Sequence, residues 1–167
     1  ACVPNFLPAG NVSRPSISSL ISGIYDSGME LNEKEIFWNN TLPTALAAQI
    51  KRLGYQTIYW YGGNSSSGNF TKYGKAQGFD RIENATEFCG PQAPQTWLGV
   101  YDHVFLEEAA KRIVAMEEPT FHFVYTTTNH GPYKLEDKYL DFDARRDLPG
   151  VGDDILNRKD GNKGLAT

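Results

Sequence analysis

The sequence predicts an α/β fold in which a mostly parallel sheet is flanked by helices. Helix-like and strand-like segments alternate along residues 14–128, and the two strand-like runs QTIYWY and TFHFVYTTT are rich in β-branched and aromatic residues. Each run is followed by a polar segment, YGGNSSSGN after the first and TTNHGPY after the second. Ligands of parallel sheets bind outside the carboxyl ends of the strands, so we expect a site there.

The first predicted element is a helix over about residues 14–22. Ser13 is suited to the N-cap position, Pro15 is tolerated in the first turn, and Gly23 ends the helix. One buried face is expected from Ile17, Leu20 and Ile21. A serine oxygen at the positive end of a helix can also hold an anion or act as an assisted nucleophile, although most such serines only cap.

The segment 41–61 predicts a helix, a turn and a buried strand. Thr41 is expected to cap the helix, Pro43 lies in its first turn, and Gly54 ends it. The helical assignment rests on Leu42, Leu46, Ile50 and Leu53, which recur at helical spacing. A short helix and a return strand around residues 79–82 follow.

A second amphipathic helix is predicted in residues 101–119, ahead of the strand at 120–128. Its inward face is expected to consist of Val104, Phe105, Ala109, Ile113 and Met116. The charged, Gly-rich residues 141–167 are expected to form an exposed excursion.

Composition restricts the class of protein. The net charge of −4 and the scattered positions of the 16 Lys and Arg residues argue against a nucleic-acid partner. The sequence has no apolar run near the ~18 residues of a membrane span. Both chain ends look cut, so we expect an excised fragment. Cys2 and Cys89 can pair in an oxidising compartment, but two cysteines do not settle this.

Several collinear segments resemble the sulfatase family. In the run NVSRPSISSLISG, residues 11–23, Ser13 and the residues after it have the spacing of the sulfatase signature. The later segments TLPTALAAQIKRLGYQTIYWYGGN, GFDRI, GVYDHVFLEEA and YTTTNHGPY resemble blocks of the lipoteichoic acid synthase and phosphoglycerol transferase branch. The resemblance implies an alkaline-phosphatase-like α/β fold that is incomplete, with residues 1–167 forming the N-terminal portion of a sulfatase-like catalytic domain.

The resemblance also implies roles for individual residues. Ser13 takes the place of the family's nucleophile, which is also a metal ligand, and His130 that of a substrate-contacting histidine. The loop residues Gly62, Gly63, Asn64 and Asn69 are implied to border the substrate. The implied cofactor is one divalent ion, Mn²⁺ or Mg²⁺, or Ca²⁺ in a sulfatase. Its remaining ligands are expected outside this chain.

Some departures from the family pattern concern the chemistry at Ser13. Sulfatases convert their Cys or Ser to formylglycine in a motif that requires Arg four residues later, and Ile17 occupies that position. Direct attack by the Ser13 hydroxyl is therefore favoured. Residues 1–12 contain no acid that could bind a metal ion. The dipeptide Asp102-His103 is expected on an exposed helix surface and not at a metal site.

Other departures concern substrate contacts. The tryptophan of the family's WGV.D block corresponds to Leu98 in this sequence, and Trp97 lies one position before it. Lipoteichoic acid synthases carry an aromatic and a basic residue after the loop that corresponds to GGN, residues 62–64. This pair is missing here, because Gly68 and Phe70 occupy the nearest positions. Arg14 can meet a phosphate, but such an arginine is more often solvated or structural. His122, which alternates with phenylalanines in a strand, is expected to be structural.

The function implied is that of a fragment of an extracytoplasmic, metal-dependent phosphotransferase or hydrolase acting on glycerophosphate-type or related phosphoesters. A sulfatase and a non-catalytic glycan-binding domain of the same fold remain alternatives. The implied partners are a phospholipid head group or an anionic glycan, no nucleic acid, and a membrane reached through segments outside this chain. The isolated chain is expected to be inactive, because one hydroxyl cannot hold a catalytic divalent ion.

Overall fold

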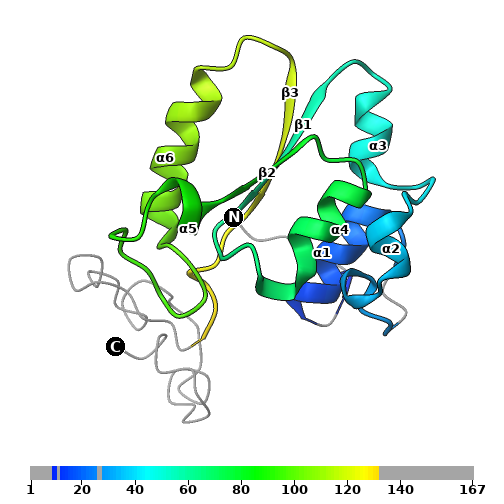
Figure 1. Ribbon diagram of the computed structural model, residues 1–167, viewed down its shortest axis with the longest axis horizontal. Helices are drawn as coiled ribbons and strands as arrows, with labels where there is room; N and C mark the ends of the chain where they lie inside the picture. The colour runs from blue at the N-terminus through cyan, green and yellow to red at the C-terminus, as the bar shows by residue number, and fades with distance from the viewer. Residues whose placement is uncertain (1–8, 11, 26–27, 132–167) are drawn as a thin grey trace, which may run out of the picture.

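A computed structural model describes residues 9–10, 12–25 and 28–131, and Figure 1 shows their arrangement. Three parallel strands form a sheet in the order β2-β1-β3: β1 is Gln56–Tyr61, β2 is Arg81–Asn84 and β3 is Thr120–Tyr125. The predicted parallel α/β class is therefore confirmed. Both strand-like runs of the sequence form strands, and they are neighbours in the sheet.

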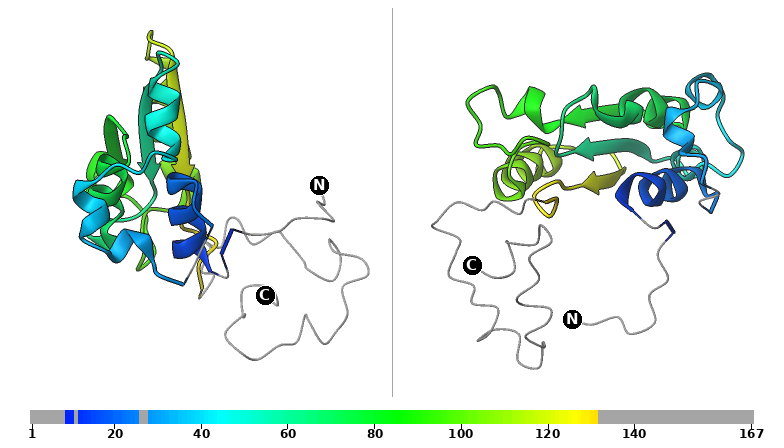
Figure 2. Two further views of the ribbon diagram at one scale, coloured as in Figure 1. Left: turned by 90° about the vertical axis from the view of Figure 1, so that its right-hand side faces the viewer. Right: turned by 90° about the horizontal axis from the view of Figure 1, so that it is seen from below.

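Helices cover both faces of this sheet. Figures 1 and 2 show α6 on one side and α1 and α4 on the other. The helices are α1 (Ser13–Ser22), α2 (Ile36–Asn39), α3 (Leu46–Lys51), α4 (Phe70–Ala76), α5 (Ala85–Phe88) and α6 (Asp102–Val114), with short 3₁₀ turns η1 (Leu31–Glu33) and η2 (Ser67–Asn69). No helix in the described ranges is long and apolar enough to cross a bilayer.

The central strand β1 divides the core into two clusters. Because successive side chains of a strand point to opposite faces, Tyr59 and Tyr61 face one side while Ile58 and Trp60 face the other. The first cluster also holds Ile21, Leu31, Ala47, Phe70, Tyr73 and Phe79, and the second holds Ala85, Val100, Phe105 and Ala109. The predicted inward face of α6 is confirmed, since its remaining members pack on the second cluster.

The carboxyl ends of β1 and β3 lie side by side. Tyr61, the last residue of β1, is in register with Tyr125, the last residue of β3. The loops that start at Gly62 and Thr126 therefore leave the sheet at adjacent points. This is the edge at which the sequence predicts a site.

Helix α1 begins one residue earlier than predicted. Val12 is its N-cap, and Ser13 is the first helical residue with no capping hydrogen bond, so the prediction that Ser13 caps the helix is wrong. The first turn is closed by the Ser16 N–H, which donates to the Val12 carbonyl. Gly23 ends the helix in the left-handed conformation, φ 72°, as predicted. Leu20, placed on the buried face by the sequence, is half exposed.

The helix predicted from residue 41 begins only at Leu46. Thr41 does not cap it, because the Thr41 hydroxyl donates to the Ala76 carbonyl and the next N–H donates to the Gln77 side chain. The segment ahead of α3 is therefore held by α4. Small side chains at Ala45 and Ala47 are buried, whereas Leu53 is exposed.

The return strand β2 begins two residues later than predicted. The Phe79 N–H still donates to the Gly74 carbonyl at the end of α4, and the Asp80 N–H donates to the Thr57 carbonyl. The turn after α4 therefore extends through both residues. The predicted excursion at 141–167 and the pairing of Cys2 lie outside the described residues. Cys89 is half-buried, and burial raises the pKa of its thiol.

Candidate functional site

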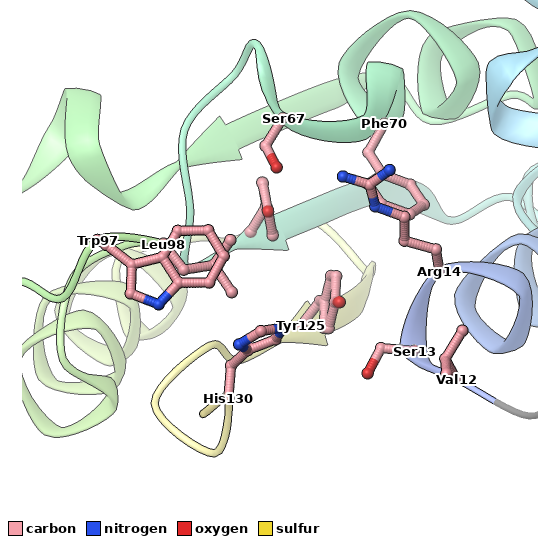
Figure 3. Close-up of a pocket in the computed structure, with 10 residues that line it drawn as sticks. Val12, Ser13, Arg14, Ser67, Phe70, Trp97, Leu98, Tyr125 and His130 are labelled. Carbon is pink, nitrogen blue, oxygen red and sulfur yellow. The ribbon is translucent and has the colours of Figure 1, made fainter. Parts of the chain in front are cut away.

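A pocket of about 500 Å³ lies at the carboxyl edge of the sheet. Figure 3 shows α1 on one side of the pocket, the 97–98 loop and His130 on the other, and the strand ends between them. Its lining comprises Val12, Ser13, Arg14, Tyr61, Ser67, Phe70, Trp97, Leu98, Tyr125 and His130. The structure thus brings the predicted nucleophile and the predicted substrate histidine to one pocket from opposite ends of the described chain. No acid is among these lining residues.

One wall of the pocket is the first turn of α1. Ser13 is exposed in the first turn of this helix, and its hydroxyl is within hydrogen-bonding reach of the Tyr125 phenol in the pocket. Arg14 follows it and extends toward Phe70 in Figure 3. This wall therefore presents a hydroxyl and a cation together.

The floor of the pocket consists of stacked Tyr61 and Tyr125, whose ring centroids are 5.2 Å apart. Burial raises the pKa of both phenols, while the positive charge of Arg14 acts in the opposite direction. The Ser13 hydroxyl also lowers the pKa of Tyr125, but burial prevails. Both phenols are therefore protonated at neutral pH and can donate hydrogen bonds to an anion.

The opposite wall consists of Trp97 and His130, which share one acceptor. The Trp97 indole N–H donates to the Gly131 carbonyl at 3.2 Å, and His130 Nδ1 lies 2.9 Å from the same oxygen. The two rings meet edge to face, with centroids 5.1 Å apart. Trp97 therefore faces the pocket despite its displacement by one position in the sequence motif.

The His130 turn is fixed by Asp102 at the start of α6. Asp102 Oδ1 accepts hydrogen bonds from the backbone N–H groups of Thr127 and Thr128 at 2.9 and 3.0 Å, and the Asp102 N–H donates to the Thr128 hydroxyl. Asp102 and His103 are half-buried, so their predicted placement on an exposed helix surface is wrong. Asp102 instead holds the turn that carries His130.

Gly62 and Gly63, the glycines of the GGN loop at residues 62–64, are not among the lining residues of the pocket. The Gly62 carbonyl accepts from the Val100 N–H at 2.9 Å, and Gly63 pairs with Gly99 in an isolated bridge. A Cβ on Gly63 would lie 2.5 Å from the Tyr61 ring. These glycines thus permit a close approach of backbone and ring that positions the floor.

Asn64 and Asn69, also predicted to border the substrate, are likewise outside the lining. Asn64 Oδ1 accepts from the backbone N–H and the hydroxyl of Ser66 in a local turn. Asn69 has a positive φ of 53° and donates its amide to Glu33 Oε2 at 2.7 Å. In the structure both asparagines shape the loop that carries Ser67.

Ser13 is the residue of this chain predicted to bind a metal ion. Within the described ranges there is no cluster of three or more His, Cys, Asp or Glu side chains suited to a metal ion. A divalent cation of the Mg²⁺ type requires about six oxygen ligands, of which several come from water or substrate. The described residues do not, by themselves, fit such an ion.

Comparison with known proteins agrees with this fold. The sulfatase family model matches residues 2–160. The chain is 31% identical over 81 residues to the lipoteichoic acid synthase-like protein YvgJ of Bacillus subtilis, which covers 48% of the chain and 12% of that protein. It is 26% identical over 115 residues to lipoteichoic acid synthase of Staphylococcus aureus, covering 69% of the chain and 17% of the enzyme.

Two solved structures share the fold. One is a protein of the alkaline phosphatase superfamily from Vibrio parahaemolyticus, with a TM-score of 0.62 and 25% identity over 72% of this chain and 30% of that one. The other is the lipoteichoic acid synthase LtaP from Listeria monocytogenes, with a TM-score of 0.72 and 15% identity over 95% of this chain and 37% of that one.

These matches define the class as the sulfatase and alkaline phosphatase superfamily. The chain belongs to the sulfatase family, in the branch similar to lipoteichoic acid synthases. It spans less than a fifth of the length of the two curated relatives compared above.

Proposed function

We propose that the chain is part of the catalytic domain of a phosphotransferase or phosphoester hydrolase that acts outside the cytoplasm. The observation that carries this proposal is the pocket in which the exposed Ser13 hydroxyl lies with Arg14 and His130 and with no carboxylate among the lining residues. Such a lining suits a substrate anion. We propose glycerophosphate-type phosphoesters, presented by a phospholipid head group or an anionic glycan, with membrane anchoring through segments beyond this chain.

In the proposed reaction, Ser13 Oγ attacks the phosphorus of a phosphodiester and loses its proton. A bond forms between Oγ and phosphorus while the bond from phosphorus to the leaving alcohol breaks, and that alcohol departs with a proton. A second alcohol or water then attacks the phosphodiester formed on Ser13 and loses a proton as its bond to phosphorus forms, while the bond from phosphorus to Oγ breaks and Ser13 regains a proton. Attack by the alcohol completes a transfer reaction, and attack by water completes a hydrolysis.

His130 is suited to a proton or hydrogen-bond role in both steps. Because the Gly131 carbonyl can only accept, a hydrogen bond across the 2.9 Å contact requires the proton to be on Nδ1. In that tautomer Nε2 accepts a proton, and it can donate one after the ring has become protonated. We propose that Nε2 contacts the leaving oxygen or a phosphate oxygen.

We also propose that a divalent ion, Mn²⁺ or Mg²⁺, assists the reaction. Such an ion lowers the pKa of a coordinated hydroxyl and neutralises phosphate charge. Ser13 is the ligand that this chain would provide. The other ligands would come from parts of the protein beyond this chain, because the described residues do not form the rest of a site.

Mass spectrometry of the full-length protein tests the nucleophile. After quenching during turnover of a phosphodiester, we expect the phospho-adduct on Ser13, and we expect Ser13→Ala to abolish both adduct and turnover. Ser65→Ala is the matched control, because Ser65 lies in the neighbouring loop outside the pocket lining. Full turnover by Ser13→Ala would refute the proposal. Formylglycine at position 13 would instead identify a sulfatase.

A further inference from the structure

Arg14 lines the pocket and forms an ion pair with Glu33 that contains no hydrogen bond. Its side chain is 52% exposed, and Nη1 lies 3.7 Å from Glu33 Oε1, which is an ion pair but beyond hydrogen-bond range. Because no hydrogen bond joins the two groups, the guanidinium retains donors for another acceptor. Figure 3 shows it extended from α1 along the pocket.

Glu33 stays on its own side of this pair because amide groups hold it. Glu33 Oε2 accepts from the Asn69 amide at 2.7 Å, and Oε1 accepts from the Asn32 amide at 3.2 Å. Asn32 is fully buried; its amide also donates to the Gly68 carbonyl, and its Oδ1 accepts from the Ser18 hydroxyl. The carboxylate is therefore fixed between α1 and η2 by contacts that do not involve the guanidinium.

The backbone of η2 at Gly68 lies beside the side chain of Arg14. Gly68 has a φ of 62°, and a Cβ built on it would lie 3.7 Å from Arg14 Nε. The charge of Arg14 also reaches the floor, because it lowers the pKa values of Tyr61 and Tyr125 against the effect of burial. Arg14 thus provides a positive charge that acts across the pocket.

From this geometry we infer that Arg14 is the residue of this chain that binds the non-bridging oxygens of the phosphoryl group at Ser13, and that Glu33 is its positioning residue. The inference rests on the proposed function for the identity of the anion. The planar guanidinium offers paired N–H groups to a tetrahedral oxyanion, which a lysine ammonium cannot match in geometry. Glu33 restrains the guanidinium by charge and leaves these donors free for the ligand.

The test uses the full-length protein and two readouts, calorimetric binding of inorganic phosphate and steady-state kinetics on a chromogenic phosphodiester. We expect Arg14→Gln to weaken phosphate binding and lower kcat/KM by about 10- to 100-fold, as for loss of charged hydrogen bonds, with an unchanged thermal unfolding temperature. Arg14→Lys should restore only part of the loss. Arg52→Gln is the matched control, since Arg52 is exposed at the end of α3 and outside the lining.

Glu33→Gln tests positioning separately. A structural role alone would alter stability without altering phosphate affinity, whereas a positioning role should raise KM severalfold while kcat changes little. The assignment of Arg14 as the phosphate-binding residue would be overturned if Arg14→Gln changed the phosphate affinity by less than twofold. It would also be overturned if the wild-type protein bound no phosphate. If phosphate binding depends on Arg14 but no adduct forms on Ser13, the proposed reaction fails and the anion site stands.

Discussion

The close approach of Gly99 to the GGN loop gives a quantitative prediction for Gly99→Ala. The added Cβ would lie 2.2 Å from the Gly62 carbonyl oxygen and 2.7 Å from Gly63 Cα, where ordinary contacts are at 3.4 Å or more. Both neighbours are backbone atoms, so the two segments have to separate by about 1 Å. This separation would also strain the hydrogen bond from the Val100 N–H to the Gly62 carbonyl.

The cost follows from these two effects. Overpacking costs about 1–3 kcal/mol and a weakened buried backbone hydrogen bond about 1 kcal/mol, so we expect a loss of about 3 kcal/mol. For a domain of this size that lowers the thermal midpoint by about 6–12 °C, measurable by circular dichroism. Glu117→Ala is the control, because Glu117 is exposed and substitutions at such surface positions change stability by about 0.5 kcal/mol or less. A midpoint for Gly99→Ala within 2 °C of wild type would refute the reasoning.

Two further predictions concern His122 and metal binding. Burial lowers the pKa of His122 below 6.5, and its Nδ1 accepts from the Trp60 indole at 3.0 Å, so the folded state favours the neutral ring. The stability that the neutral His122 ring contributes is therefore complete above pH 6.5 and declines as the pH falls through the lowered pKa of the folded state. Urea unfolding midpoints measured at several pH values should show this decline, and the decline should be smaller in His122→Gln. The 167-residue chain alone should show neither tight Mn²⁺ binding by calorimetry nor phosphodiesterase activity, because the described residues provide too few metal ligands. Micromolar Mn²⁺ binding, together with turnover that Ser13→Ala abolishes, would contradict this prediction.

The strands and α6 were predictable because their patterns are local. The run QTIYWY is apolar throughout, and β1 is buried at all positions but the first. The helix expected from residue 41 failed because a distant residue decides it. Gln77 is fully buried and binds the Leu42 N–H and the carbonyls of Phe37 and Asn40, so this segment is held away from helical geometry. Helical spacing in one segment carries no information about such a partner.

The candidate site was predictable only in part. Sequence reasoning placed Ser13 and His130 in one site, and the structure brings both to the pocket, while their chemical roles stay predictions. The floor was missed, although a signal existed: Tyr61 and Tyr125 are the last residues of two strands expected to be parallel neighbours. The anchoring role of Asp102 had no such signal, because it depends on how the 127–128 backbone meets the start of α6.

The two walls of the pocket are stabilised by hydrogen-bond networks that have no residue in common. Glu33 and Asn32 join the nucleophile wall to η2, whereas the Gly131 carbonyl holds Trp97 against His130. Free-energy changes from substitutions in separate networks are close to additive. Substitutions at Trp97 should therefore change the stability of the protein by nearly the same amount whether or not the hydrogen bonds around Glu33 are intact.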